Sequence, residues 1–209
     1  MTSPTSEPTT TTRAKRSGRR RLESWFGPRG AGIVEWVIVI VGAILLALVV
    51  KVFLLQAFYI PSLSMSPTLD VGDRVLVNKL SYRLHDVNRG DIVVFERPAS
   101  ETSSTIPDLI KRVIGLPGES ITIENGAVFV DGQRLDESYL PDGTVTSTAN
   151  APNKCTTQAP CVVPEGKVWV MGDNRGDSKD SRYFGPIDES TIVGRAFITV
   201  WPLGRFGLL

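Results

Sequence analysis

Histidine is almost absent from this chain, whose 209 residues contain only His85. A catalytic Ser-His-Asp triad would have to use it, yet it lies in the polar segment 83–86, as solvated surface histidines do. The chain also contains no Gly-x-Ser-x-Gly elbow and no Ser-x-x-Lys motif. These absences exclude the commonest sequence signatures of serine nucleophiles.

Cysteine is scarce as well, with only Cys155 and Cys161, six positions apart. Two cysteines and one histidine do not complete a four-ligand structural zinc site. A calcium loop counted from Asp173 has Arg175 at its third position and no glycine at its sixth. We therefore expect no metal site. In an oxidising compartment, a small disulfide loop is the favoured interpretation of the two cysteines.

The net charge is only +1, but it is unevenly distributed. Residues 1–55 contain eight Lys or Arg and three Glu, whereas the remaining residues contain fifteen Lys or Arg and nineteen Asp or Glu. Nucleic-acid binding would need a basic face on the larger, acidic part. We therefore expect no nucleic-acid partner.

The chain has one apolar run of membrane length, residues 33–55, which is long enough to cross a hydrocarbon core of about 30 Å. Residues 1–31 are rich in Thr, Ser, Pro, Arg and Gly, which predicts a disordered basic tail. The positive-inside rule places that tail in the cytoplasm, a single anchor at 32–55 and residues 56–209 outside. A cleaved signal peptide is the alternative, but the run is long and no small-x-small site follows it.

Beyond residue 56 helical periodicity is lacking and β patterns dominate. Asn125-Gly126 and Asp131-Gly132 are strong hairpin turns. Short β-branched runs predict strands at 74–77, 91–95, 109–114, 120–123, 127–130, 167–171 and 191–200. The fold class is therefore mainly β, an antiparallel sandwich or folded sheet that follows a single N-terminal transmembrane helix.

Two residues attract attention as a nucleophile and its base. Ser64 lies in a proline-bounded segment just after the apolar run. Without a usable histidine, lysine is the obvious base, and it must be buried to lose its proton at neutral pH. Lys111 fits best, since it lies in an apolar strand where alternation places it on one face with Leu109 and Val113. The alternative is an edge-strand lysine that opposes aggregation.

A third cluster, residues 172–182, follows a predicted strand and is rich in Gly, Asp and Ser. It contains Arg175-Gly176-Asp177, and Arg89-Gly90-Asp91 repeats that adhesion tripeptide earlier in the chain. An adhesion or scaffold domain is thus a non-catalytic alternative. It leaves the serine, the strand lysine and the glycine-rich serine loop unexplained.

Five segments together, in order and in spacing from the anchor, resemble the type I signal peptidases of bacteria. They are residues 62–69, 72–79, 89–95, 111–119 and 172–182. The resemblance covers essentially all of residues 33–202. It implies a signal-peptidase-like fold and a membrane-bound serine endopeptidase with a Ser/Lys dyad and no cofactor.

The resemblance also implies roles for individual residues. Ser64 matches the nucleophile and Lys111 the general base. Ser62 matches an oxyanion-hole residue that acts with the Ser64 N–H, and Ser178 matches the serine that orients the lysine. Asp180 and Arg182 match a structural ion pair. The residues that match the shallow apolar pockets for small substrate side chains are Ile60, Met65, Leu69, Leu109 and Ile110.

Some positions leave alternatives open. Each of the five pocket residues has an ordinary core residue as its alternative. Lys179 departs from relatives with a small apolar residue there, and it either lowers the pKa of Lys111 or points to solvent. Cys155 and Cys161 fall in a loop where some relatives have a disulfide.

The resulting hypothesis is a monomeric, single-pass protein of the bacterial cytoplasmic membrane. Its outer domain would remove signal peptides from secretory preproteins. Cleavage would follow small residues at −1 and −3 and proceed through an acyl-enzyme. Its partners would be those preproteins and the lipid bilayer. A self-cleaving Ser/Lys protease of the repressor type is the alternative enzyme. It would be cytosolic with a DNA-binding module, which the anchor and the acidic outer part contradict.

Overall fold

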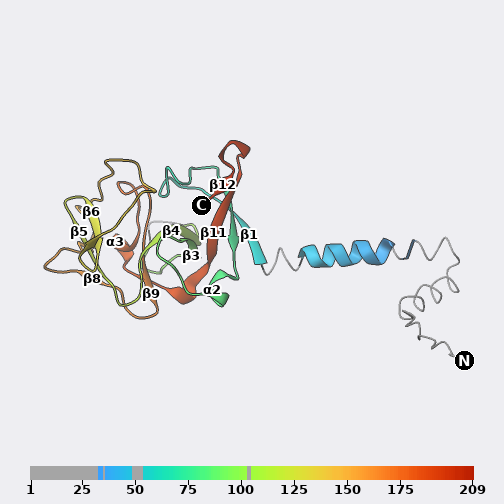
Figure 1. Cartoon of the computed structure of the whole chain (residues 1–209), viewed down its shortest axis with the longest axis horizontal. Coiled ribbons are helices and arrows are strands. Elements are labelled where there is room, and N and C mark those ends of the chain that lie inside the picture. Colours follow the sequence, from blue (N-terminus) through green and yellow to red (C-terminus); the bar gives the residue numbers. More distant parts are fainter. Residues whose placement is uncertain (1–32, 35, 49–53, 103–104) are drawn as a thin grey trace, which may run out of the picture. The chain divides into compact units, whose positions relative to one another are not determined.

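The computed structural model describes residues 33–34, 36–48, 54–102 and 105–209 (Figure 1). The chain divides into two compact units, residues 1–50 and 51–209. In the first unit, residues 33–34 and 36–48 are helical. Within the described ranges, we find no helix that combines the length and apolarity needed to cross a bilayer. The predicted tail, 1–31, lies outside the described residues, as do parts of the predicted anchor, which stays a prediction.

The second unit is built mainly from strands, with a few single-turn helices. Its strands are β1 Leu55–Tyr59, β2 Arg74–Asn78, β3 Ile92–Glu96, β4 Asp108–Gly115, β5 Ser120–Glu124, β6 Ala127–Val130, β7 Gln133–Arg134, β8 Cys161–Val162, β9 Lys167–Met171, β10 Ile187–Asp188, β11 Ile192–Trp201 and β12 Gly207–Leu208. Its helical turns are α2 Ser81–Leu84, α3 Ser181–Phe184, η2 Glu189–Thr191 and η3 Leu203–Arg205.

The larger sheet has eight strands in the order β1-β2-β11-β3-β4-β9-β10, with β12 added to β11. All its strand pairs are antiparallel, as the sequence predicts. Strand β4 pairs with β3 along its length, from Ile92↔Arg112 to Glu96↔Asp108. On its other side β4 pairs with β9, so it is an interior strand. The edge-strand alternative for Lys111 is therefore wrong.

The smaller sheet has the order β7-β6-β5-β8 and follows from the two predicted hairpin turns. Asn125 and Gly126 have φ of 49° and 78°, and Asp131 and Gly132 have φ of 49° and 77°. Consecutive positive φ values define the tight turn that matches the twist of a hairpin, and Asn-Gly and Asp-Gly adopt it readily. These turns set the registers of β5 with β6 and of β6 with β7.

The seven predicted strands are all present, within one or two residues of their predicted ends. The structure adds strands that apolar alternation did not mark, β1, β7, β8, β10 and β12. The first of these changes a boundary, because Leu55, predicted as the last anchor residue, begins a strand that pairs with β2. Four of these strands have only two residues, and β1 lies at a sheet edge, where few side chains need burial.

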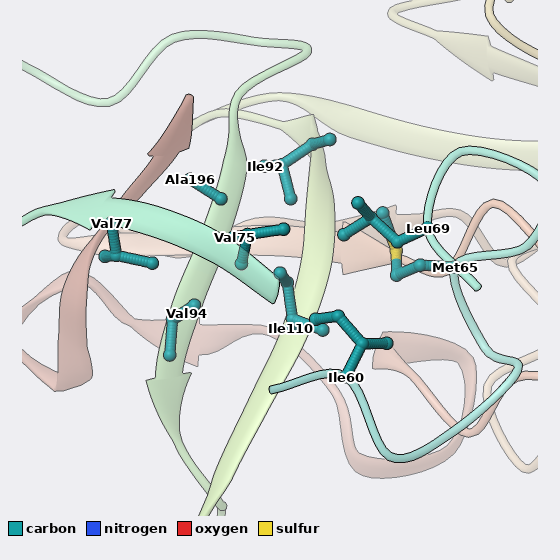
Figure 2. Close-up of a cluster of buried hydrophobic side chains, with 9 residues drawn as sticks. All are labelled: Ile60, Met65, Leu69, Val75, Val77, Ile92, Val94, Ile110 and Ala196. Atoms are coloured by element: carbon teal, nitrogen blue, oxygen red, sulfur yellow. The ribbon is translucent and has the colours of Figure 1, made fainter. Parts of the chain in front are cut away.

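A buried apolar cluster lies beneath the segment that contains Ser64 (Figure 2). Met65 and Leu69 have no exposed surface and reach from that segment into the cluster. Burying a large aliphatic side chain contributes about 1.5–3 kcal/mol, so the two residues hold the segment on the sheet. The members from the strands and from the end of β1 are Ile60, Val75, Val77, Ile92, Val94, Ile110 and Ala196.

Candidate active site

The side chains of Lys111 and Ser64 meet although they are 47 positions apart, and the Lys111 Nζ lies 2.7 Å from the Ser64 Oγ. The same amine donates to the carbonyl of Ile110 at 2.9 Å. Lys111 is only 3 % exposed. Burial lowers the pKa of its amine from 10.5 to about 8, against the opposing effect of Asp180, Asp173 and Glu101. The serine hydroxyl thus faces an amine that is partly neutral near neutral pH.

The sheet explains why Lys111 is placed there. Strand β9 pairs with β4 at Arg112↔Met171 and then ends, so the loop that begins at Gly172 lies beside Lys111. Lys111 pairs with Val93 on its other side. The lysine therefore lies at the point where one neighbouring strand gives way to a loop, with room for a second segment to approach its amine.

The Ser64 segment is held by its own backbone. Ile60 N donates to Asp73 O at 2.9 Å, and Gly72 N donates back to Ile60 O at 3.0 Å. Between these points Leu69 N donates to Met65 O at 2.9 Å. The segment is thus a closed loop, which keeps Ser64 in place without placing it in a helix or strand.

Ser62 lies beside Ser64, and its Oγ is 3.4 Å from the Ser64 Oγ. The backbone N–H of Ser64 donates to no acceptor within the described part of the chain. Both groups are thus available to a substrate oxygen on this side of Ser64.

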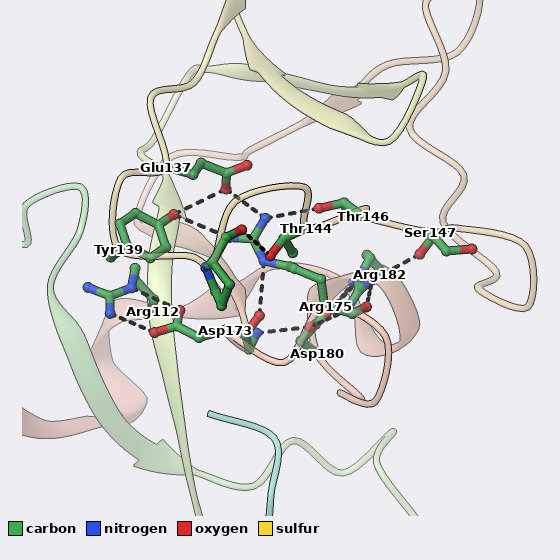
Figure 3. A network of polar contacts seen from close by, with 12 residues as sticks. Arg112, Glu137, Tyr139, Thr144, Thr146, Ser147, Asp173, Arg175, Asp180 and Arg182 are labelled. Carbon is green, nitrogen blue, oxygen red and sulfur yellow. Dashed lines mark hydrogen bonds and ion pairs between the residues drawn. The ribbon is translucent and has the colours of Figure 1, made fainter. Parts of the chain in front are cut away.

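The loop 172–182 is fixed by buried ion pairs (Figure 3). Asp180 and Arg182, which are 0 % and 2 % exposed, form an ion pair of 2.8 Å. Asp180 also accepts the N–H of Gly172 at 3.0 Å, which ties the two ends of the loop together. A Cβ on Gly172 would overlap the Ser178 hydroxyl and the Ser64 carbonyl, so the close approach of the loop to Ser64 requires glycine.

Ser178, predicted to orient the lysine, is buried at the same place. It is 8 % exposed, and its hydroxyl has no hydrogen-bond partner within the described residues. A buried hydroxyl without a partner is energetically unfavourable. Its role toward Lys111 stays a prediction.

Sequence reasoning missed the contacts of Asp173. Its carboxylate accepts the Arg112 Nη2 at 2.6 Å and the hydroxyl of Thr68 at 2.6 Å. It therefore links the three segments that contain Lys111, Ser64 and Ser178. Both Arg112 and Asp173 are buried, and the Arg112 guanidinium also lies 4.0 Å from the centre of the Tyr139 ring. The only sequence signal was their position beside Lys111 and Gly172.

The five predicted pocket residues separate into two groups. Ile60, Leu109 and Ile110 line one small cavity of about 180 Å³ with the neighbouring residues of β1 and β4. Met65 and Leu69 do not line it, and both have no exposed surface. Met65 and Leu69 are therefore core residues, whereas the other three line a cavity between the end of β1 and the start of β4.

The adhesion tripeptides are used internally. Arg89 binds Glu119, Asp91 pairs with Arg195 at 2.9 Å, and Arg175 is buried against Glu137 at 2.6 Å. An adhesion site needs these side chains exposed, so this alternative is wrong for Arg175 and Asp91.

The remaining predicted residues lie on the surface or in the small sheet. His85 is exposed, and its Nδ1 is 2.8 Å from the carbonyl of Asp86. The side chain of Lys179 is exposed too. Cys155 and Cys161 are joined by a disulfide that connects β8 to the loop before it.

A serine hydroxyl against a buried amine of lowered pKa is the arrangement that a hydrolase with a serine nucleophile and a lysine base requires. The family model described as "Signal peptidase, peptidase S26" matches residues 33–201. The chain belongs to this family of serine endopeptidases.

Two relatives identified by sequence agree with that assignment. A probable signal peptidase I-2 of Synechocystis is 41% identical over 81% of this chain and 73% of its own length. Signal peptidase IB of Staphylococcus aureus is 37% identical over 83% of this chain and 92% of its own. A crystal structure of a signal peptidase I from Enterococcus faecalis is 28% identical, with a TM-score of 0.41 over 53% of this chain and 97% of that one.

Proposed function

We propose that this protein is a membrane-bound serine endopeptidase that removes N-terminal signal peptides from exported preproteins. The observation that carries the proposal is the 2.7 Å contact between the Lys111 amine and the Ser64 hydroxyl, made by a lysine whose pKa is about 8. The family of the chain supports the substrate class.

In the proposed reaction, the Ser64 Oγ attacks the scissile carbonyl carbon while its proton passes to the neutral Lys111 amine. The oxyanion accepts hydrogen bonds from the Ser62 hydroxyl and the Ser64 N–H. Lys111 then gives its proton to the leaving nitrogen as the C–N bond breaks, which leaves an acyl-enzyme ester. A water molecule, deprotonated by Lys111, then attacks the ester carbonyl. The bond to the Ser64 Oγ breaks, this oxygen takes the proton back from Lys111, and the signal peptide leaves with a new carboxyl end.

The proposed cleavage preference is supported by the small cavity between the end of β1 and the start of β4. Ile60, Leu109 and Ile110 leave about 180 Å³ there, which suits small side chains at −1 and −3. Leu109→Ala should widen the cavity and allow larger residues at these positions, measured as the ratio of kcat/KM for Val and Ala substrates. An unchanged ratio would exclude Leu109 from the pocket.

The proposed topology is an N-terminus in the cytoplasm, one anchor within the apolar run before β1 and a catalytic domain outside, in the bacterial cytoplasmic membrane. It is supported by the apolar run and by the basic residues before it. Such an anchor would bring Ser64, nine residues after its predicted end, to the membrane surface, where a signal peptide is itself held in the bilayer.

The test compares the purified full-length protein with Ser64→Ala, Lys111→Ala and the matched control Lys179→Ala, whose exposed lysine is in the neighbouring loop. The two site variants should keep the wild-type circular dichroism and lose cleavage of a preprotein with Ala-x-Ala at its signal end. The control should cleave normally. A serine-acylating inhibitor should label Ser64 in the wild type and in Lys179→Ala, and should label neither site variant. Normal cleavage by either site variant would refute the mechanism.

A further inference from the structure

Asn174 contacts the nucleophile from the opposite loop at two points. Its backbone N–H donates to Ser64 O at 3.1 Å, and its side-chain Nδ2 donates to Leu63 O at 3.2 Å. These two carbonyls are on either side of the Ser64 Cα. No other residue in the described part of the chain donates to both carbonyls.

The side-chain contact determines the direction of the oxyanion donor. The Leu63–Ser64 peptide is trans, so its carbonyl and its N–H point in opposite directions from one rigid plane. Holding Leu63 O therefore aims the Ser64 N–H, and that N–H has no acceptor of its own within the described residues. A hydrogen bond to the carbonyl also polarises the peptide and strengthens its N–H as a donor.

Asn174 is itself held firmly enough for this task. The preceding residue, Asp173, is 2 % exposed and binds both Arg112 and Thr68. Asp177 N donates to Asn174 O at 3.1 Å. The residue thus projects from a fixed loop, and its amide reaches the peptide without rearrangement.

We propose that Asn174 is a positioning residue whose side-chain amide orients the Leu63–Ser64 peptide, so that the Ser64 N–H faces the developing oxyanion. The proposal rests on the proposed function and adds a residue to its site. The hydrogen bonds of Asn174 with this segment are to the backbone carbonyls of Leu63 and Ser64, and not to the reacting Ser64 Oγ. Because Ser66 N also donates to Leu63 O at 2.9 Å, losing the amide weakens the orientation without abolishing it.

The test is Asn174→Ala in the full-length protein, since this change removes the side-chain bond and keeps the backbone bond to Ser64 O. Removing an oxyanion donor lowers kcat by about 100- to 1,000-fold, so we expect a smaller loss of about 10- to 100-fold. KM should change less than about twofold, because a ground-state carbonyl needs the donor much less. The isosteric Asn174→Asp, which has no donor, should not restore kcat.

A peptide aldehyde with Ala-x-Ala measures the orientation directly, because its carbonyl becomes an oxyanion when Ser64 adds to it. Its inhibition constant should rise in Asn174→Ala by the same factor as kcat/KM falls. In Asn174→Ala, the pH dependence of kcat/KM should keep its wild-type midpoint, since this substitution changes no charge near Lys111.

Asn153→Ala is the matched control. Asn153 donates through Nδ2 to Ser181 O at 3.0 Å, at the end of the loop 172–182 that is remote in sequence from Asn174. It should lower the melting temperature and leave the aldehyde affinity unchanged. Wild-type aldehyde affinity in Asn174→Ala, a loss confined to KM, or an equal loss in Asn153→Ala would overturn the proposal. If the wild-type protein cleaves no preprotein, the proposed function itself fails, which is a separate result.

Discussion

The titration of Lys111 is the most direct test of the chemistry. A lysine base acts only in its neutral form, and burial brings its pKa to about 8. About a tenth of the molecules are then competent at pH 7, about half at pH 8 and about nine-tenths at pH 9. We therefore expect kcat/KM to rise about tenfold from pH 6 to 7, about fivefold from 7 to 8, and to level off above 9.

A neighbouring carboxylate allows the midpoint of this pH profile to be shifted in a known direction. Glu101 raises the pKa of Lys111, so Glu101→Gln should move the midpoint of the profile to lower pH. The exposed Glu165 is not among the groups that shift Lys111, and Glu165→Gln should leave the midpoint unchanged. His85→Ala should also leave the midpoint unchanged, because that exposed ring contacts the Asp86 carbonyl and the Tyr82 ring and is not among the groups that shift the pKa of Lys111.

The assay is kcat/KM on a preprotein with Ala-x-Ala, measured from pH 6 to 10.5, because this ratio reports the free enzyme. Carbon-13 NMR of the Lys111 side chain, assigned with Lys111→Arg, gives the pKa independently. A profile that is flat over this range, or one that rises until pH 10.5, would refute a base whose proton is lost through burial.

Three further predictions concern stability and transition-state binding. Lys111→Met should stabilise the inactive protein by about 3 kcal/mol below pH 8, because the folded state no longer holds a buried ammonium. The wild type regains this stability as the pH rises from about 8 to 10.5, so the difference between the two unfolding curves should shrink over that window. Gly172→Ala should abolish cleavage and lower the melting temperature, since its Cβ overlaps Ser178, whereas Gly176→Ala meets no atom within 4 Å and should behave as wild type in both assays. Ser62→Ala should lower kcat by about 100-fold or more in steady-state assays, with thermal melting unchanged; an unaltered kcat would remove Ser62 from the oxyanion hole.

The local part of the fold was predictable because its causes are local. The hairpins at Asn125-Gly126 and Asp131-Gly132 depend on residues that adopt positive φ, and the structure has the turns where they were expected. Strands with buried alternating residues were also found. The shortest and edge strands were missed, because their pairing satisfies backbone groups and leaves little pattern in the side chains.

For the candidate site, the sequence identified the two central residues but not the contacts that hold them in place. Ser64 and Lys111 could be named because only one histidine is present and because five motifs resemble a known family. The contacts of Asp173 and Asn174 could not be predicted from the sequence. Thr68 and Asp173 are separated by 105 positions, and no periodicity links them.

The sequence by itself determined the kind of chemistry, since a chain with a single surface histidine needs another base for its serine, and it determined the β class through turn residues and alternation. Only the tertiary structure decided how the candidate base is buried and which charges surround it. The pKa of Lys111 depends on burial by segments far away in the chain, and on the distances to Asp180, Asp173 and Glu101. Electrostatics and desolvation act through space, so they are fixed only when the segments come together.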